Sequence, residues 1–160
     1  TQGLYDRLRD EAELASVLAH EIAHVVQQHQ VKAIRKEMGR DFAAELAGEA
    51  TGRSDNELVR RFGDRAFRVG TELFVRGLDK NDEHQADAHG MVIAARGGYN
   101  PYALVSALHT LDGTAPDDTG VALMFSTHPN PVTRIEYLDK VIGDRLEPYA
   151  GAVAPDRMVR

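Results

Sequence analysis

The sequence predicts a mainly helical protein, and three observations carry that prediction. Apolar residues recur at helical spacing, as at Leu14, Val17 and Leu18, whereas segments that alternate strictly between apolar and polar residues are missing. The 160 residues, 42% of them hydrophobic, are enough for one domain with a sizeable core. A net charge of -6 with scattered basic residues argues against nucleic acid as a partner.

The first predicted helix spans residues 10–38, because neither Pro nor Gly interrupts the apolar periodicity before Gly39. Since its middle is apolar on nearly all sides, we expect it to be the central helix. Residues 41–51 and 55–76 predict two further, more charged helices, and together the segment 41–77 forms either a helical lid over a cleft or a pair of solvated surface helices.

A fourth helix is predicted over residues 81–96, where Gly97 provides a C-terminal stop. Pro101 begins a fifth helix that reaches Leu111.

An irregular region follows over residues 112–130, which are rich in Gly, Asp, Pro and Thr. A sixth helix is predicted over residues 132–142. The last residues contain two prolines and little periodicity, so we expect a domain over 1–143 and an extended or frayed tail over 144–160.

The segment LAHEIAH contains the pattern that points to chemistry. On a helix His20 and His24 lie four residues apart and direct their rings to one point. In the H-E-x-x-H motif of zinc peptidases two such histidines hold Zn²⁺, and the glutamate, here Glu21, is the general base. Because the chain has no cysteine, only His, Asp and Glu remain as metal ligands.

Two alternatives to a zinc peptidase site stay open for this motif. Such a pattern also arises by chance in chains of this size. The unit Glu21-x-x-His24 is furthermore found in ferritin-like di-iron bundles, although these need a second E-x-x-H unit, which the chain lacks.

Two histidines do not complete a catalytic zinc site, so a third donor has to come from elsewhere in the chain. In the fourth predicted helix Glu83 and Asp87 are four residues apart and share a face. Glu83 is therefore a candidate ligand, and Asp87 is a candidate partner for the second ring nitrogen of a ligand histidine. On spacing alone, both are explained equally well as ordinary surface acids.

The other histidines receive different expectations. His84 and His89 lie on other sides of the fourth helix than Glu83 and are expected to be non-ligands. His29 lies five residues beyond His24 and is expected to point elsewhere, with a structural role that it shares with His109. His128 sits in a loop before a proline, a position from which residues that complete a site often come.

Four segments in fixed order, LAHEIAH, EHQAD, GYNPYALVSAL and STHPNPVTRI, resemble the gluzincin peptidase family. That family contains the HtpX-like heat-shock proteases, the CAAX prenyl endopeptidases and the periplasmic BepA-like metallopeptidases. The resemblance extends from about Ala12 to Leu138 and is closest to the soluble BepA-like members. It implies a zincin-like helical metallopeptidase domain that binds one Zn²⁺ per chain.

The resemblance maps the zinc ligands of the family onto three residues, His20, His24 and Glu83. It implies that Glu21 is the catalytic base and that Asp87 is the aspartate beside the ligands. His128 is then either an oxyanion stabiliser or a fourth ligand that closes the resting site. Arg134 matches the arginine of the H-P-x-x-x-x-R-I motif, with a substrate role or a structural salt bridge.

Two features depart from the family pattern. The chain has Asp79-Lys80 where the family usually has Ser-Arg, so a charged contact is altered. Only about ten residues precede the HExxH helix, so the N-terminal β-sheet of the family, whose edge strand pairs with extended substrate, is expected to be largely missing. We therefore expect Thr1 to be a truncation point or the chain to be a fragment.

The implied function is a zinc metalloendopeptidase of protein quality control that hydrolyses peptide bonds in unfolded or misfolded proteins through zinc-activated water. The alternative is a zinc-stabilised, chaperone-like module that binds misfolded chains without cutting them. Since no apolar run approaches the roughly 20 residues of a transmembrane helix, the resemblance favours soluble relatives and a periplasmic or otherwise extracytoplasmic location. It leaves the oligomeric state and any membrane association open.

Overall fold

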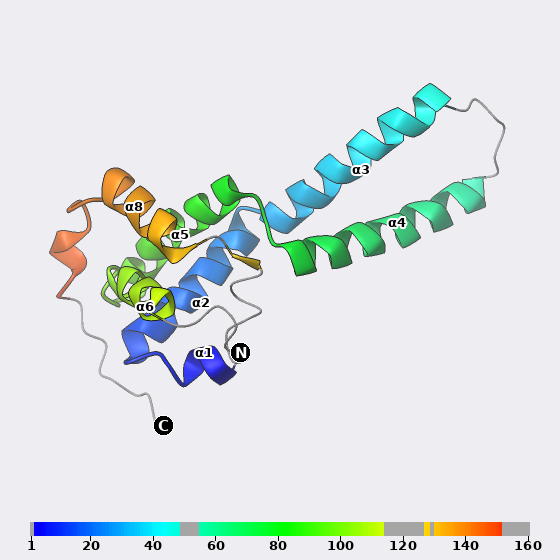
Figure 1. Ribbon diagram of the computed structural model, residues 1–160. Helices are drawn as coiled ribbons and strands as arrows, with labels where there is room; N and C mark the ends of the chain where they lie inside the picture. Colours follow the sequence, from blue (N-terminus) through cyan, green and yellow to red (C-terminus); the bar gives the residue numbers. More distant parts are fainter. Residues whose placement is uncertain (1, 49–54, 114–126, 129, 152–160) are drawn as a thin grey trace.

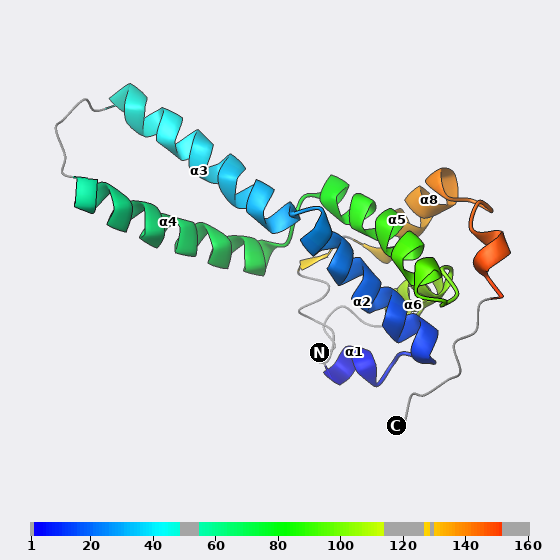
Figure 2. The same ribbon diagram turned by 180° about the vertical axis from the view of Figure 1, so that it is seen from behind.

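The computed structural model describes residues 2–48, 55–113, 127–128 and 130–151, and the seven α-helices of these residues confirm the predicted helical class. No β-strand occurs among the described residues. A body of packed helices carries a long antiparallel hairpin of two helices that extends away from it (Figures 1 and 2). None of the described helices combines the length and the apolarity that crossing a membrane requires.

The helices of the body are α1 (Gln2–Tyr5), α2 (Glu11–Val26), α5 (Lys80–Arg96), α6 (Ala103–Asp112) and α8 (Pro131–Val141). The hairpin consists of α3 (His29–Gly48) and α4 (Asp55–Arg76), and a 3₁₀-helix, η1 (Glu147–Tyr149), follows α8. Residues 114–126 and 129 of the predicted irregular region lie outside the described residues, as do residues 49–54 and 152–160.

The prediction of one helix over residues 10–38 is wrong. The helix ends after Val26, and α3 begins at His29 and runs through to Gly48, so the separate helix expected over 41–51 is part of α3. Gln28 adopts a positive φ of 56°, which interrupts the hydrogen-bond ladder between the two helices. The sequence carries no Gly, Pro or Asn at this point to signal the break.

Helix α2 is central but not covered on all sides. It packs against α5 and α6, whereas Leu18 and Val25 are 53% and 71% exposed. The apolar residues of α2 therefore lie partly on an exposed face of the described part of the chain. Asp10 caps the N-terminus of α2, because its side chain accepts a hydrogen bond from the N–H of Glu13.

The close approach of α2 and α5 depends on a glycine. A Cβ atom at Gly90 would lie 3.0 Å from the backbone N and Cα of His20. The absent side chain therefore lets the backbone of α5 approach the turn of α2 that carries His20. Asp79 fixes the start of α5 by accepting a hydrogen bond from the N–H of Asn81, which sets the register of the helix.

Two apolar clusters hold α6 in place. One joins α6 to the N-terminal residues Leu4 and Leu8, and the other joins it to Met91 of α5 and Leu138 of α8. Leu146 packs against the second cluster, so the described part of the predicted tail, up to residue 151, is folded into turns and η1 rather than extended. Burial of apolar area of this kind stabilises a fold by about 25 cal/mol per Å².

Candidate metal centre

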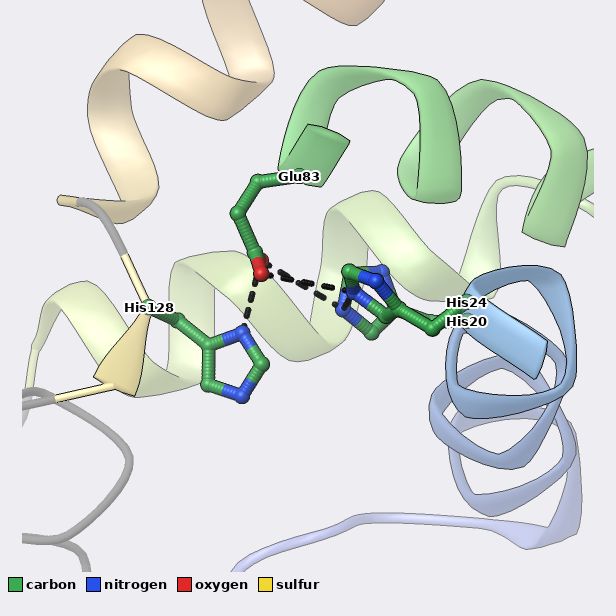
Figure 3. A group of neighbouring side chains, drawn as sticks. All are labelled: His20, His24, Glu83 and His128. Atoms are coloured by element: carbon green, nitrogen blue, oxygen red, sulfur yellow. Dashed lines mark hydrogen bonds and ion pairs between the residues drawn. The ribbon is translucent and has the colours of Figure 1, made fainter. Parts of the chain in front are cut away.

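Four side chains from three parts of the fold converge on one point in Figure 3. His20 and His24 project from α2, Glu83 projects from the first turn of α5, and His128 precedes α8. One nitrogen or oxygen atom of each residue lies within 4.8 Å of the corresponding atoms of the other three. The first turn of α5 thus meets the part of α2 that carries the two histidines of the H-E-x-x-H motif.

The candidate ligand atoms of these four residues face one another at short distances. The Nε2 atoms of His20 and His24 are 3.1 Å apart, and they lie 3.5 Å and 3.3 Å from the two carboxylate oxygens of Glu83. His128 Nδ1 is 2.6 Å from Glu83 Oε2. The buried Oε1 of Glu83 has no hydrogen-bond partner among the described residues. A divalent metal ion fits this donor set, because it would satisfy an acceptor that is otherwise left unpaired.

Glu83 is ionised in this setting. Its side chain is fully buried, with an exposed fraction of 0%, so it is not the surface acid that spacing alone also allowed. Burial by itself would raise the pKa of the carboxyl group, but hydrogen bonds with His128, His20 and His24 outweigh it and lower the pKa well below its usual value. An ionised carboxylate beside imidazole nitrogens is a donor set suited to a cation.

Asp87 lies one helical turn beyond Glu83 and contacts the other side of a histidine. Its Oδ1 is 2.9 Å from Nδ1 of His20, so this nitrogen donates a hydrogen bond to the carboxylate and Nε2 is left to face the cluster. Arg134 of α8 donates two hydrogen bonds to the same carboxylate, one of them 2.8 Å long from Nε. Both Asp87 and Arg134 are buried, at 0% and 4% exposure.

The pKa values around this triad follow from burial and hydrogen bonds. Burial opposes ionisation of Asp87, but hydrogen bonds with Arg134 and His20 outweigh it and lower its pKa. Burial likewise lowers the pKa of His20, yet the hydrogen bonds to Asp87 and Glu83 win, and the pKa is raised. The two carboxylates therefore favour the protonated form of His20.

His29 is the residue that the sequence reasoning missed. It is buried, and its Nδ1 lies 2.9 Å from Nδ1 of His24, so the expectation that it points away from His24 is wrong. The break at Gln28 turns α3 so that His29 comes back beside α2. The sequence would have revealed this contact only if it contained a signal for the helix break at Gln28. It contains no such signal.

Glu21, between the two histidines in sequence, presents its side chain to solvent. It lines a cavity that His24, Glu83 and His128 also line. An exposed carboxylate at the edge of the cluster is able to reach a water molecule or a peptide that enters this cavity.

The position of His128 depends on a backbone contact at the base of the hairpin. Gly77, which follows α4, has a φ of 82°, and the carbonyl group of Thr127 lies where a Cβ atom of residue 77 would be. Glycine permits both the backbone conformation and the close approach. The segment that carries His128 is thereby held against the turn between α4 and α5.

The remaining histidines lie outside the cluster. The ring of His84 stacks on Tyr137 at a centroid distance of 4.2 Å, and His89 is exposed and contacts the side chain of Gln27. His109 is exposed on α6. Each has a position that does not involve the four converging residues.

Peptidases of the H-E-x-x-H type place a metal ion between two histidines of one helix and a third donor from elsewhere in the chain. The described fold and cluster define a protein of this class, a helical metallopeptidase domain. The chain belongs to Peptidase family M48, since the family model matches residues 1–142.

Relatives with assigned names agree with that membership. The chain is 28% identical over 174 residues to the protease HtpX homolog of Salinibacter ruber, which covers 89% of this chain and 59% of the relative. It is 29% identical over 130 residues to the beta-barrel assembly-enhancing protease of Escherichia coli K12, and 27% identical over 128 residues to that of Yersinia pestis. Each of these two alignments covers 79% of this chain and 26% of the relative.

The chain therefore spans between about a quarter and three fifths of the length of these relatives. No solved structure matches it. The matched residues form a domain of the Peptidase M48 family.

Proposed function

We propose that the chain is a zinc-dependent endopeptidase domain with His20, His24 and Glu83 as the metal ligands. Two imidazole nitrogens and one carboxylate are a donor set of catalytic zinc sites. The inward-facing Nε2 atoms and the unpaired Oε1 of Glu83 support this assignment. A zinc ion bound there lowers the pKa of water in its open position to about 7 and polarises the peptide carbonyl.

Glu21 acts as the general base. It accepts the proton that the attacking water loses as its oxygen bonds to the carbonyl carbon, and it transfers this proton to the nitrogen of the breaking peptide bond. Its exposed side chain at the cavity edge supports this role, because water and substrate reach it there. His128 acts in one of two ways, as a donor to the developing oxyanion or as a fourth ligand in the resting site.

Asp87 and Arg134 position the ligands. Asp87 accepts a hydrogen bond from Nδ1 of His20 and so selects the tautomer in which Nε2 binds metal. Arg134, paired to Asp87, neutralises the buried carboxylate and ties α8 to α5, which favours a structural role over a substrate contact. We propose that residues 1–143 form the peptidase domain and that 144–160 follow it as a C-terminal segment.

We further propose unfolded or misfolded polypeptides as substrates and a periplasmic or otherwise extracytoplasmic location. The likeness to beta-barrel assembly-enhancing proteases supports this assignment. The single observation that carries the proposal is the meeting of Glu83 with the two histidines of α2.

Digestion of casein by the zinc-loaded chain tests this function. We expect cleavage that a chelator abolishes and added zinc restores. Glu21→Gln is expected to keep its zinc but lose on the order of 10² to 10⁴ in rate, because removal of a general base typically costs that much. Glu136→Gln, which changes an exposed glutamate of α8, is the matched control and is expected to cleave at the wild-type rate.

Full activity of Glu21→Gln would contradict its role as the base. A wild-type chain that binds zinc and unfolded casein but leaves the casein intact would instead identify a chaperone-like binding module.

A further inference from the structure

The cavity beside the candidate metal centre is large enough to hold part of a substrate. Its volume is about 280 Å³, close to the lower end of the roughly 300 to 1,000 Å³ typical of ligand sites. At one end it is lined by residues of the proposed reaction, Glu21, His24, Glu83 and His128. Any side chain that enters it is therefore next to the bond that would be cut.

The hairpin lines the rest of the cavity mostly with apolar residues, beside the polar Gln30 of α3. Ile34 of α3 and Leu73 of α4 form two of its walls, and Leu78, which follows α4, forms a third. Among the described residues neither a lysine nor an arginine lines the cavity. A charged side chain would lose its hydration there without gaining a partner of opposite charge from the hairpin, whereas burial of a large apolar side chain is favourable.

The second cavity that Glu21 lines has no comparable room. The space between α2 and α6 there, lined by Val17, Leu104 and Leu108, measures only about 20 Å³. Among the described residues, the base of the hairpin is therefore the part of the centre that accommodates a large side chain.

We propose that the base of the α3–α4 hairpin is a specificity pocket for a large apolar side chain, such as Leu, Ile, Met or Phe, on one of the two residues that flank the scissile bond. This inference rests on the proposed endopeptidase function and adds its substrate class. Stretches of chain with such side chains are buried in folded proteins, so the pocket selects polypeptides that expose them.

Gly70 of α4 controls the size of this pocket. It lines the cavity, and a Cβ atom placed on it would lie 3.8 Å from Cδ1 of Ile34, an ordinary van der Waals distance. A larger side chain at this position begins without a clash and extends toward the apolar wall. Since glycine lowers helix stability by about 1 kcal/mol relative to alanine, its replacement does not weaken α4.

The test uses the zinc-loaded full chain and peptides that differ only in one of the two residues at the scissile bond, which is varied among Phe, Leu, Ala, Gly, Asp and Lys. We expect kcat/KM at one of the two positions to be at least about tenfold higher for Phe or Leu than for Gly, Asp or Lys. Gly70→Leu is expected to lower kcat/KM for the Phe peptide about tenfold and to leave the Ala peptide within about threefold.

Gly63→Leu is the matched control, because Gly63 lies on the same helix, is exposed and has no atom within 4 Å of an added Cβ. It is expected to keep the wild-type preference. Ile34→Asp is a second variant that tests the same wall by charge, and we expect it to favour the Lys peptide over the Leu peptide.

Equal cleavage of all peptides by the wild type, or a preference that neither Gly70→Leu nor Ile34→Asp alters, would overturn the pocket while leaving the endopeptidase intact. Absence of any chelator-sensitive cleavage would overturn the proposed function and the pocket with it.

Discussion

Nδ1 of His24 lies 2.9 Å from Nδ1 of His29, and both rings are buried. One of the two nitrogens donates a hydrogen bond to the other. When Nε2 of His24 binds a metal ion, its Nδ1 carries the proton and donates, so that His29 accepts. Across the break between α2 and α3, His29 thus fixes the orientation of one proposed ligand, as Asp87 does for the other.

His29→Ala is expected to lower zinc affinity about 10- to 100-fold, the usual effect of removing such a hydrogen-bond partner of a ligand. Competition with a chromophoric chelator measures the change. His109→Ala, which removes an exposed histidine of α6, is the control. Equal affinities of the His29 variant and the wild type would show that the contact does not act on the metal site.

Arg134→Met is expected to destabilise the metal-free protein by about 3 to 5 kcal/mol, because it leaves the carboxylate of Asp87 buried without its partner. Urea denaturation at neutral pH measures this loss. A loss below about 1 kcal/mol would mean that the pair adds little to the fold.

The same pair predicts a pH dependence with a definite sign. Because the pKa of Asp87 is lowered by Arg134 and His20, which outweigh its burial, the ionised form contributes stability above the unfolded pKa of about 3.9. That contribution is lost as the pH falls below about 4 and the carboxylate protonates. We expect the free energy of unfolding of the metal-free protein to decline less steeply over this range in Asp87→Asn than in the wild type. Parallel curves would contradict this assignment.

Gly77→Ala is expected to reduce peptidase activity as strongly as His128→Ala does. An alanine at this position has to adopt a left-handed φ and collides with the carbonyl group of Thr127, so the segment that carries His128 has to move. Gly39→Ala on α3 is the control, since no atom lies within 4 Å of its added Cβ. Casein digestion compares the three variants, and wild-type activity of Gly77→Ala would contradict this role of the glycine.

Acid is expected to release the metal ion. The imidazoles bind metal only when neutral, whereas the lowered pKa of Glu83 keeps its carboxylate ionised well below the pH at which histidines protonate. Burial lowers the pKa of His20, but its bonds to Asp87 and Glu83 raise it overall, so protons compete for this ligand more strongly than for an ordinary histidine. Metal analysis after dialysis is expected to show a falling zinc content between about pH 6.5 and pH 4. An unchanged zinc content at the acid end of this range would contradict the histidine assignment.

Local spacing explains why part of the candidate site is visible in the sequence. Residues four apart on a helix share a face whatever the rest of the fold does, so His20 and His24, and likewise Glu83 and Asp87, form pairs without knowledge of the tertiary structure. The order of the four motifs, which resembles that of a known family, indicated that His128 belongs with His20, His24 and Glu83. The structure brings His20, His24, Glu83 and His128 together at one point.

The predicted helix boundaries agree with the structure for three helices and fail at the end of α2. The boundaries of α4, α5 and α8 lie within a residue of those predicted, because Asp79 and Asn130 cap α5 and α8 and Arg96 precedes a glycine. The end of α2 lies twelve residues before the predicted limit at residue 38. The local sequence does not predict the positive φ of Gln28 that ends α2 there.

By itself the sequence determined the helical class, the H-E-x-x-H histidine pair with its adjacent glutamate, and the carboxylates one turn apart, because each depends on a period of about 3.6 residues along one helix. Only the tertiary structure decided that His29 contacts His24, that Arg134 contacts Asp87, and that the hairpin base walls a cavity at the centre. These relationships join residues of different helices. They depend on where a helix breaks and on how closely a glycine lets two helices pack. The spacing of residues within one segment predicts neither of these features.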